Sequence, residues 1–289
     1  AATVGNGCMV ALGAASRAGR LSGDARDKLL ADMTDEVAAL VLSNNAAQTL
    51  ILSVVEAHAR ERLQGHVRLM EMLEASGRLD RQVEGLPGPR DIEERKRLNR
   101  GLTRPELAVL LSYTKMELKD ALVESDLVAD PLLEEDLFRA FPPLMRKPYE
   151  AEIRGHQLRR QIVATKLANL LVNRGGVTLA HDLSAELGVP LPTVAAAFVS
   201  ARTLFDLDSL WAAIDAAKVP AAQALAFHGE AAAVTRVLVG DLAVRTGAES
   251  PERLSARLAP GLKRLLPRLD TLLRPEPRAQ VEAIRQRLT

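Results

Sequence analysis

Residues 102–127 read LTRPELAVLLSYTKMELKDALVESDL, and this stretch decides the fold class. Thr103 and Glu106 have the spacing of a capping box, with Pro105 in the first turn, where a missing backbone N–H is harmless. A largely apolar stripe then recurs every three or four residues, which places it on one face of a helix. Its members are Leu107, Leu110, Leu111, Thr114, Leu118, Ala121 and Leu122. The stretch therefore predicts a long amphipathic helix that packs against neighbours.

Similar helix signals recur along the chain, and strand signals are nearly absent. Capping residues such as Ser22 and Thr34 precede helix-forming runs, and Gly77 follows one. Helices are expected over about 23–31, 34–62, 66–76, 103–124, 131–140, 158–174, 178–187, 191–205, 207–218 and 221–246, with a further one from Ser250-Pro251. The predicted fold is all-α, a bundle of about ten to thirteen helices that could form two packed sub-bundles.

The expected domain organisation has three parts. Residues 1–18 are a poorly ordered or linking segment, 19–175 an N-terminal helical bundle, and 176–289 a C-terminal bundle with a basic tail. The soft boundary follows Gly175-Gly176, where two glycines end an apolar run.

The tail from residue 252 to residue 289 carries nine Arg or Lys against four acids and is broken by four prolines. Leucines recur in it at helical spacing, namely Leu262, Leu265, Leu266, Leu269, Leu272 and Leu273. Two interpretations stay open: a last helix packed on the bundle, or an interface helix that docks on the rest of a longer chain or on a neighbouring subunit.

Composition excludes several classes of protein. The formal net charge of +1 does not suit a polycation that binds nucleic acid or anionic lipid. Aromatic residues make up 3% of the chain, which disfavours base-stacking platforms. The single cysteine, Cys8, rules out a disulfide framework within the chain. With no secretion signal, no uninterrupted apolar run of about 18–20 residues and no initiator Met, we expect a cytoplasmic piece of something longer.

A helix-turn-helix pattern over 179–202 is the sharpest candidate for a binding function. Its second helix would have to present polar side chains to base edges, and it offers Thr193, Ser200 and Arg202 among alanines and apolar residues. A helical regulatory or nucleic-acid-binding module is therefore the alternative function, although this composition favours a buried helix pair.

A basic cluster could form an interaction surface for an anion or an acidic partner. It comprises Arg146, Lys147, Arg154, His156, Arg159 and Arg160. Glu150 and Glu152 lie among these charges, so a solvated face of self-paired ions is the favoured interpretation.

Catalytic, cofactor and metal patterns are weak throughout. Gly5-Asn-Gly7 is the nearest approach to a dinucleotide-binding turn, and it lacks the third glycine. Two short acidic and histidine groups do not amount to a metal's ligand set; they are Glu56, His58 and Glu61, and His181, Asp182 and Glu186. No catalytic, cofactor-binding or metal-binding residue is therefore predicted.

Three helical stretches together resemble a known family. They are 29–42 (LLADMTDEVAALVL), 102–127, and 158–175 (LRRQIVATKLANLLVNRG), and their order matches the C-terminal helical region of the large bacterial NAD-specific glutamate dehydrogenases. The resemblance spans roughly Gly19 to Ala213, while residues 1–18 match poorly and the tail beyond Val219 is only loosely similar.

The resemblance implies a role in amino-acid catabolism within a larger enzyme. Such enzymes convert L-glutamate, NAD and water to 2-oxoglutarate, ammonia and NADH. This segment is then a structural, assembly or regulatory support without the catalytic site. It would bind no cofactor itself, with NAD held elsewhere in the parent enzyme. Its expected partners are the catalytic domain of the same polypeptide and further copies in a homo-oligomer, with no nucleic acid and no membrane.

Overall fold

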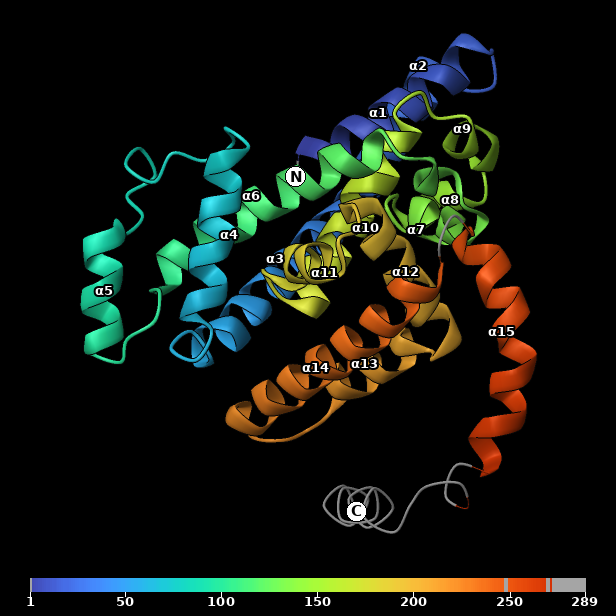
Figure 1. Ribbon diagram of the computed structural model, residues 1–289. Helices are drawn as coiled ribbons and strands as arrows, with labels where there is room; N and C mark the ends of the chain where they lie inside the picture. The colour runs from blue at the N-terminus through green and yellow to red at the C-terminus, as the bar shows by residue number, and fades with distance from the viewer. Residues whose placement is uncertain (1, 247–248, 269–270, 272–289) are drawn as a thin grey trace.

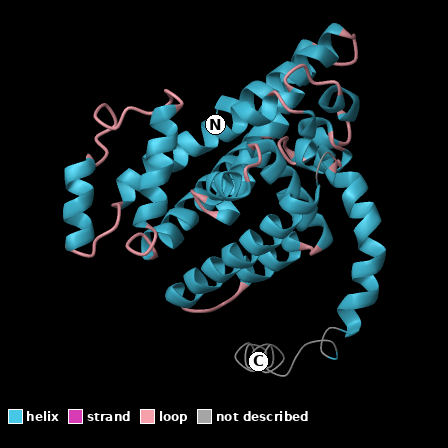
Figure 2. Ribbon diagram, in the orientation of Figure 1, coloured by secondary structure: helices cyan, strands magenta, loops and turns pink. Residues whose placement is uncertain are grey.

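The computed structural model describes residues 2–246, 249–268 and 271, and in those residues every regular element is a helix (Figures 1 and 2). The described part of the chain contains fifteen α-helices, of which α7, α8 and α9 have only four or five residues. The twelve longer ones fall within the predicted range. The all-α prediction is confirmed.

The N-terminal part contains six α-helices. They are α1 (Ala2–Arg17), α2 (Gly23–Asp32), α3 (Thr34–Ala57), α4 (Leu63–Ala75), α5 (Pro89–Arg97) and α6 (Arg104–Val123). Short elements follow: the 3-10 helices η1 (Asp126–Ala129) and η2 (Pro131–Leu133), then α7 (Glu134–Phe138), α8 (Pro143–Arg146) and α9 (Glu150–Arg154).

The C-terminal part contains six further α-helices and one 3-10 helix. They are α10 (Arg159–Gly175), α11 (Leu179–Leu187), α12 (Leu191–Leu204), α13 (Leu207–Ala216), α14 (Ala221–Thr246), α15 (Pro251–Leu265) and η3 (Leu266–Arg268). In Figure 1, α4 and α5 lie at one end of the molecule, α7–α9 lie towards the other, and α15 extends along an edge.

The packing centre is formed by α6, α10, α12 and α14, with α6 packed most extensively on α10 and α12 on α14. On α6 the predicted stripe is buried except for Ala121, which is partly buried. The backbone N–H of Thr103 donates to Glu106 Oε2 at 2.7 Å, as half of the expected capping box. Arg95 of α5 also holds Glu106 through two 2.7 Å hydrogen bonds, which joins the two helix ends.

The N-terminal segment differs from the expectation. Residues 1–18 were predicted to be poorly ordered or linking, and α1 instead occupies most of them, with Cys8, Ala11, Leu12 and Ala15 buried. Burial raises the pKa of the Cys8 thiol to about 11, so this cysteine is not a reactive thiolate near neutral pH. The helix is stabilised by burial of its apolar side chains. The short segment contains several glycines, so the sequence alone did not predict a helix there. The boundary between residues 175 and 176 stays a prediction.

Two further helices differ from the sequence-based expectation. The helix that begins at Thr34 ends at Ala57 and not near Arg62, and it continues unbroken through Asn44-Asn45. Conversely, α15 continues through Pro260, which was expected to interrupt it. Pro260 is exposed, so water can satisfy the carbonyl that loses its backbone donor. Leu269, Leu272 and Leu273 of the predicted tail lie outside the described residues.

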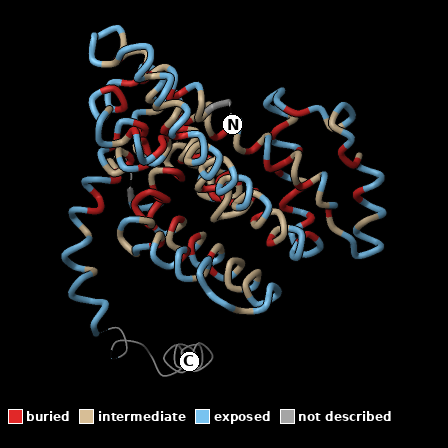
Figure 3. The backbone as a smooth tube through the Cα atoms, turned by 180° about the vertical axis from the view of Figure 1, so that it is seen from behind, coloured by how far each residue is buried: buried red, intermediate tan, exposed pale blue. Residues whose placement is uncertain are grey.

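Helix α3 keeps much of its apolar surface uncovered. Helix α15, most of which is exposed in Figure 3, does so at its C-terminal end, where Leu265 is 47% exposed. On α3 only Ile51 and Val54 are buried, and Leu42 is 66% exposed. Among the described residues, α3 is also the one helix long and apolar enough to cross a membrane, and 11% of that stretch is buried. Because α3 carries Asn44 and Asn45 near its middle, this is weak support for a membrane span.

Candidate functional site

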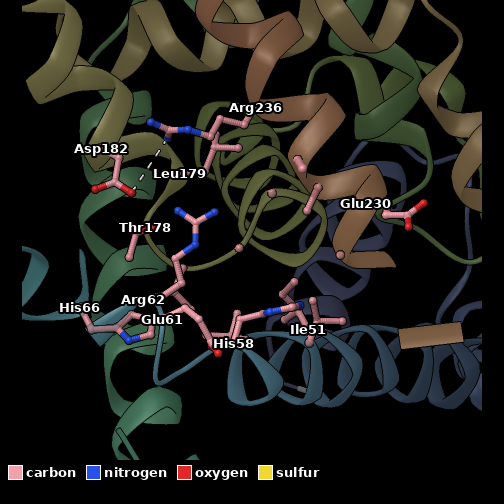
Figure 4. Close-up of a pocket in the computed structure, with 18 of the residues that line it drawn as sticks. Ile51, His58, Glu61, Arg62, His66, Thr178, Leu179, Asp182, Glu230 and Arg236 are labelled. Atoms are coloured by element: carbon pink, nitrogen blue, oxygen red, sulfur yellow. Dashed lines mark ion pairs between the residues drawn. The ribbon is translucent and has the colours of Figure 1, made fainter. Parts of the chain in front are cut away.

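A cleft of about 570 Å³ lies where α3, the start of α4, the loop before α11, and α14 meet (Figure 4). Its volume falls in the range typical of small-molecule sites. Ile51, Val54 and Val55 of α3 form an apolar wall. Opposite them α14 contributes small residues, among them Ala226 and Gly229. The packing of these helices therefore leaves a groove with one apolar side.

The polar end of the cleft contains two guanidinium groups. Arg62 comes from the turn between α3 and α4, and Arg236 comes from α14; in Figure 4 both side chains extend into the same region, near Thr178 and Asp182. Arg236 donates to both Glu186 oxygens at 2.6 Å and lies 4.0 Å from Asp182 Oδ2. Within the described part of the chain, the Arg62 side chain makes no hydrogen bond or ion pair. A cationic group is thus available at this end.

His66 of α4 lines the same end of the cleft and is 2% exposed. The pKa of His66 is lowered to about 4, chiefly by burial and also by the positive charge of Arg62, although Asp182 opposes the shift. The imidazole is therefore neutral near pH 7. Its Nδ1 atom is buried and has no hydrogen-bond partner among the described residues. A buried ring nitrogen without a protein partner has unused hydrogen-bonding capacity.

The first turn of α11 also faces the cleft, since Thr178 and Leu179 belong to its lining. Thr178 is the N-cap residue, and its side chain makes no capping hydrogen bond. Backbone N–H groups at an uncapped helix start carry partial positive charge and favour an anion. The cleft therefore combines an apolar wall with a polar end that is suited to negative charge.

A second, smaller cavity of about 170 Å³ lies between α1, α3 and α10. Lys166 lines it together with three amide side chains, Asn44, Asn45 and Asn169. Burial lowers the pKa of Lys166, an effect that Asp136 partly offsets. The sequence analysis missed this cavity, and the signal available was the Asn44-Asn45 pair in an otherwise apolar helix.

The predicted basic cluster is distributed over α8, α9, α10 and the turns between them. It was expected to comprise Arg146, Lys147, Arg154, His156, Arg159 and Arg160. His156 is 5% exposed, and its Nε2 atom lies 3.1 Å from the Gly7 carbonyl oxygen, so it is part of the interior. Arg154 pairs with Glu134 and Glu150, while Arg146 and Arg160 bond backbone carbonyls. The interaction surface stays a prediction for the residues other than His156.

The helix-turn-helix pattern corresponds to α11 and α12, which meet with a bend of 113°. The second helix is largely buried, with Val194, Ala195 and residues 197–201 inside. Arg202 was one of the three candidates for a base contact. Its guanidinium instead bonds Asp136 at 2.5 Å and Asp208 at 2.8 Å. This burial counts against the nucleic-acid alternative, because the helix that would read bases has little free surface.

The weaker candidates are not assembled into sites. Gly5-Asn-Gly7 lies inside α1, whereas a phosphate-binding turn needs free N–H groups at a helix start. Over the residues that the structure describes, no group of three or more His, Cys, Asp or Glu is placed to hold a metal ion. Glu56 instead pairs with Arg104 at 2.8 Å. His181 Nε2 lies 2.7 Å from Glu117 Oε2.

Comparison with known proteins supplies the class of this chain. Residues 99–289 match the family profile described as "Glutamate dehydrogenase, C-terminal". Residues 7–55 match the profile "Bacterial NAD-glutamate dehydrogenase, catalytic domain". The chain therefore belongs to the bacterial NAD-specific glutamate dehydrogenase family.

Three relatives share the name "NAD-specific glutamate dehydrogenase". The Pseudomonas aeruginosa protein is 44% identical over 191 residues, 66% of this chain and 12% of the relative. The Halomonas elongata protein is 42% identical over 204 residues, 70% of this chain and 13% of the relative. The Mycobacterium tuberculosis protein is 33% identical over 270 residues, 92% of this chain and 16% of the relative. The chain thus spans 12–16% of the length of these three relatives.

The family resemblance found in the three sequence stretches is confirmed, and the matches extend further than expected. They begin at residue 7, within a segment that was thought to match poorly, and they reach residue 289. Helix α2 and most of α1 and α3 therefore correspond to catalytic-domain sequence, and α6 to α15 correspond to the C-terminal region.

Proposed function

We propose that this chain is the C-terminal helical support of an NAD-specific glutamate dehydrogenase. The enzyme as a whole would oxidise L-glutamate with NAD to 2-oxoglutarate and ammonia, in the cytoplasm and as part of amino-acid catabolism. In this proposal the chemistry and the NAD site belong to other parts of the polypeptide. The helices α6 to α15 brace the catalytic domain and contribute to assembly of a homo-oligomer.

The exposed apolar face of α3 is the observation that carries this proposal. Leu42 is 66% exposed, and Ala38, Ala39 and Ala46 beside it on the helix surface are also exposed. Exposed apolar faces of this kind mark contact surfaces. Because α3 lies within the segment that matches the catalytic domain, the rest of that domain is the expected occupant of this face.

The end of α15 offers a second contact surface. Leu265 and Leu266 are 47% and 50% exposed, and Arg264 and Arg268 flank them. An amphipathic helix with an uncovered leucine face and basic flanks suits docking on another apolar surface with acidic edges. This supports the interface interpretation of the tail for its described part.

The proposal is tested by measuring molecular mass and NAD-dependent glutamate oxidation for two proteins. One is the isolated chain; the other is the full-length form, meaning a polypeptide of the relatives' length that contains this chain. We expect the isolated chain to be folded and inactive, and the full-length form to be an active oligomer. Glutamate oxidation by the isolated chain would overturn the assignment of the chemistry to other parts. A full-length form that lacks α6 to α15 and keeps normal activity and assembly would overturn the support role.

A further inference from the structure

We propose that the cleft between α3, α4, α11 and α14 binds a small carboxylate that carries an apolar body. The carboxylate group lies at Arg62 and Arg236, and the apolar body lies along the α3 wall. This inference goes beyond the proposed function and does not depend on it, because binding can be measured on the chain alone.

The charges around the cleft favour an anion. Arg62 has no ionic partner in the described ranges, and the start of α11 adds uncapped N–H groups. The acidic residues of the lining are engaged or turned away. Glu61 receives two hydrogen bonds from Arg60, at 3.1 and 2.6 Å. Glu230 points away from both guanidinium groups in Figure 4.

Among the acidic residues of the lining, Asp182 lies beside Arg236, and cations already hold it. Arg68 of α4 lies 3.6 Å from its Oδ1 atom, and Arg236 lies 4.0 Å from its Oδ2 atom. Three positive side chains lie here, those of Arg62, Arg68 and Arg236. The negative side chains are those of Asp182 and Glu186, so one positive charge is uncompensated. A monoanion balances this charge, whereas a cation would add to it.

The apolar side of the cleft gives the ligand its second feature. Residues Ile51, Val54 and Val55 face small residues of α14, so the groove beside them is open. At Gly229 an added Cβ would lie 3.5 Å from His58 Nε2 and 3.9 Å from Val54 Cγ1, so a larger side chain there would reduce the space. A short alkyl or aromatic group can occupy this groove, because burial of apolar surface favours binding.

His66 completes the polar end. Its ring lines the cleft, and its Nδ1 atom is buried and without a hydrogen-bond partner among the described residues. A bound carboxylate, directly or through a water molecule, provides the hydrogen-bonding network that this imidazole lacks. The polar groups thus converge at one end of an apolar groove, as in small-molecule sites generally.

The test is isothermal titration calorimetry of the 289-residue chain with butyrate, hexanoate and octanoate. Hexanol, hexylammonium and inorganic phosphate serve as comparison probes. Arg62→Met removes the cation at an exposed position, so the variant is expected to fold. Arg90→Met is the matched control, since Arg90 of α5 is an exposed arginine that does not line the cleft. Ala226→Trp is a second variant, which fills the groove from an exposed position.

We expect the affinity to rise by about fourfold for each added methylene group until the groove is full. Arg62→Met should weaken hexanoate binding by about tenfold or more, and Ala226→Trp should weaken octanoate more than butyrate, while Arg90→Met should leave both unchanged. The proposal is overturned if no acid binds, if Arg62→Met binds as tightly as the unmodified chain, or if hexanol, hexylammonium or phosphate binds as tightly as hexanoate.

Discussion

Helices α10 and α15 both carry leucines at helical spacing between arginines, and the structure treats them differently. On α10, Leu167 and Leu171 are 1% and 0% exposed. At the end of α15 and the start of η3, Leu265 and Leu266 remain about half exposed. An amphipathic pattern therefore predicts that a face will be covered, but it does not say whether the partner is in the same chain.

Helix α3 combines both situations along its length. Its C-terminal half is packed through Ile51 and Val54, and Arg104 of α6 reaches Ser53, Glu56 and the Thr49 carbonyl from the side. Its N-terminal half exposes Leu42. The core around α6, α10, α12 and α14 is covered by helices of this chain. The exposed apolar surfaces on α3 and α15 are proposed to be covered by other parts of the enzyme.

The largest effect is expected at the centre, from Arg202→Met. This change leaves Asp136, which is 6% exposed, without its bidentate partner. Removing one member of a buried ion pair typically costs about 3–5 kcal/mol. Urea denaturation measures the loss. Arg26→Met is the surface control, because Arg26 pairs with the exposed Asp27 and should cost less than about 1 kcal/mol. Equal losses at both positions would contradict the distinction between centre and surface.

Matched leucine truncations compare the two helices directly. Leu171→Ala should destabilise the isolated chain by about 3 kcal/mol, because it leaves a cavity in a closed core. Leu265→Ala should change the free energy of unfolding by no more than about 0.5 kcal/mol. Both values come from the same denaturation series. A loss of several kcal/mol at Leu265 would mean that the C-terminal end of α15 packs on the bundle, as its first turns do through Leu254.

His66 gives a pH-dependent effect at the cleft. The pKa of His66 is lowered to about 4 from its ordinary value of 6.5, chiefly by burial. Between these pH values the unfolded chain binds a proton that the folded chain does not, so stability falls as pH decreases through this window. His66→Gln should remove about 2 kcal/mol of the loss between pH 7 and about pH 4.5. Identical pH profiles of unfolding for the two proteins would show that the imidazole is not held neutral.

The sequence predicted the helices well where local signals decide them. Helix α2 begins after Ser22, whose side chain accepts a hydrogen bond from the Ala25 N–H, and α4 ends beside Gly77 with its φ of 69°. Glycine adopts this left-handed conformation without the penalty of a side chain. Local signals failed for α1, where long-range burial of Leu12 decides the conformation.

The cleft could not be predicted, because its parts are distant in sequence. Arg62 and His66 come from one turn and helix, while Arg236 belongs to α14, and only the packed fold places them around one space. The same long-range packing determines the partners of two candidate residues. Arg202 was a candidate base contact in a helix pair that was favoured as buried, and it bonds buried Asp136. His156 was assigned to a basic surface cluster, and it contacts Gly7 in the interior. Charge and spacing in the sequence identified these side chains as candidate binding residues, but they did not predict the residues that these side chains contact.

Leu42→Asp, introduced both into the isolated chain and into the full-length form, tests the central claim most directly. In the isolated chain, where Leu42 is exposed, we expect the free energy of unfolding to change by no more than about 0.5 kcal/mol. In the full-length form the same change should bury a carboxylate at the contact with the rest of the catalytic domain and lower glutamate oxidation or disrupt assembly. If the full-length variant keeps normal activity and mass, α3 is not a contact surface, which contradicts the observation that carries the support model.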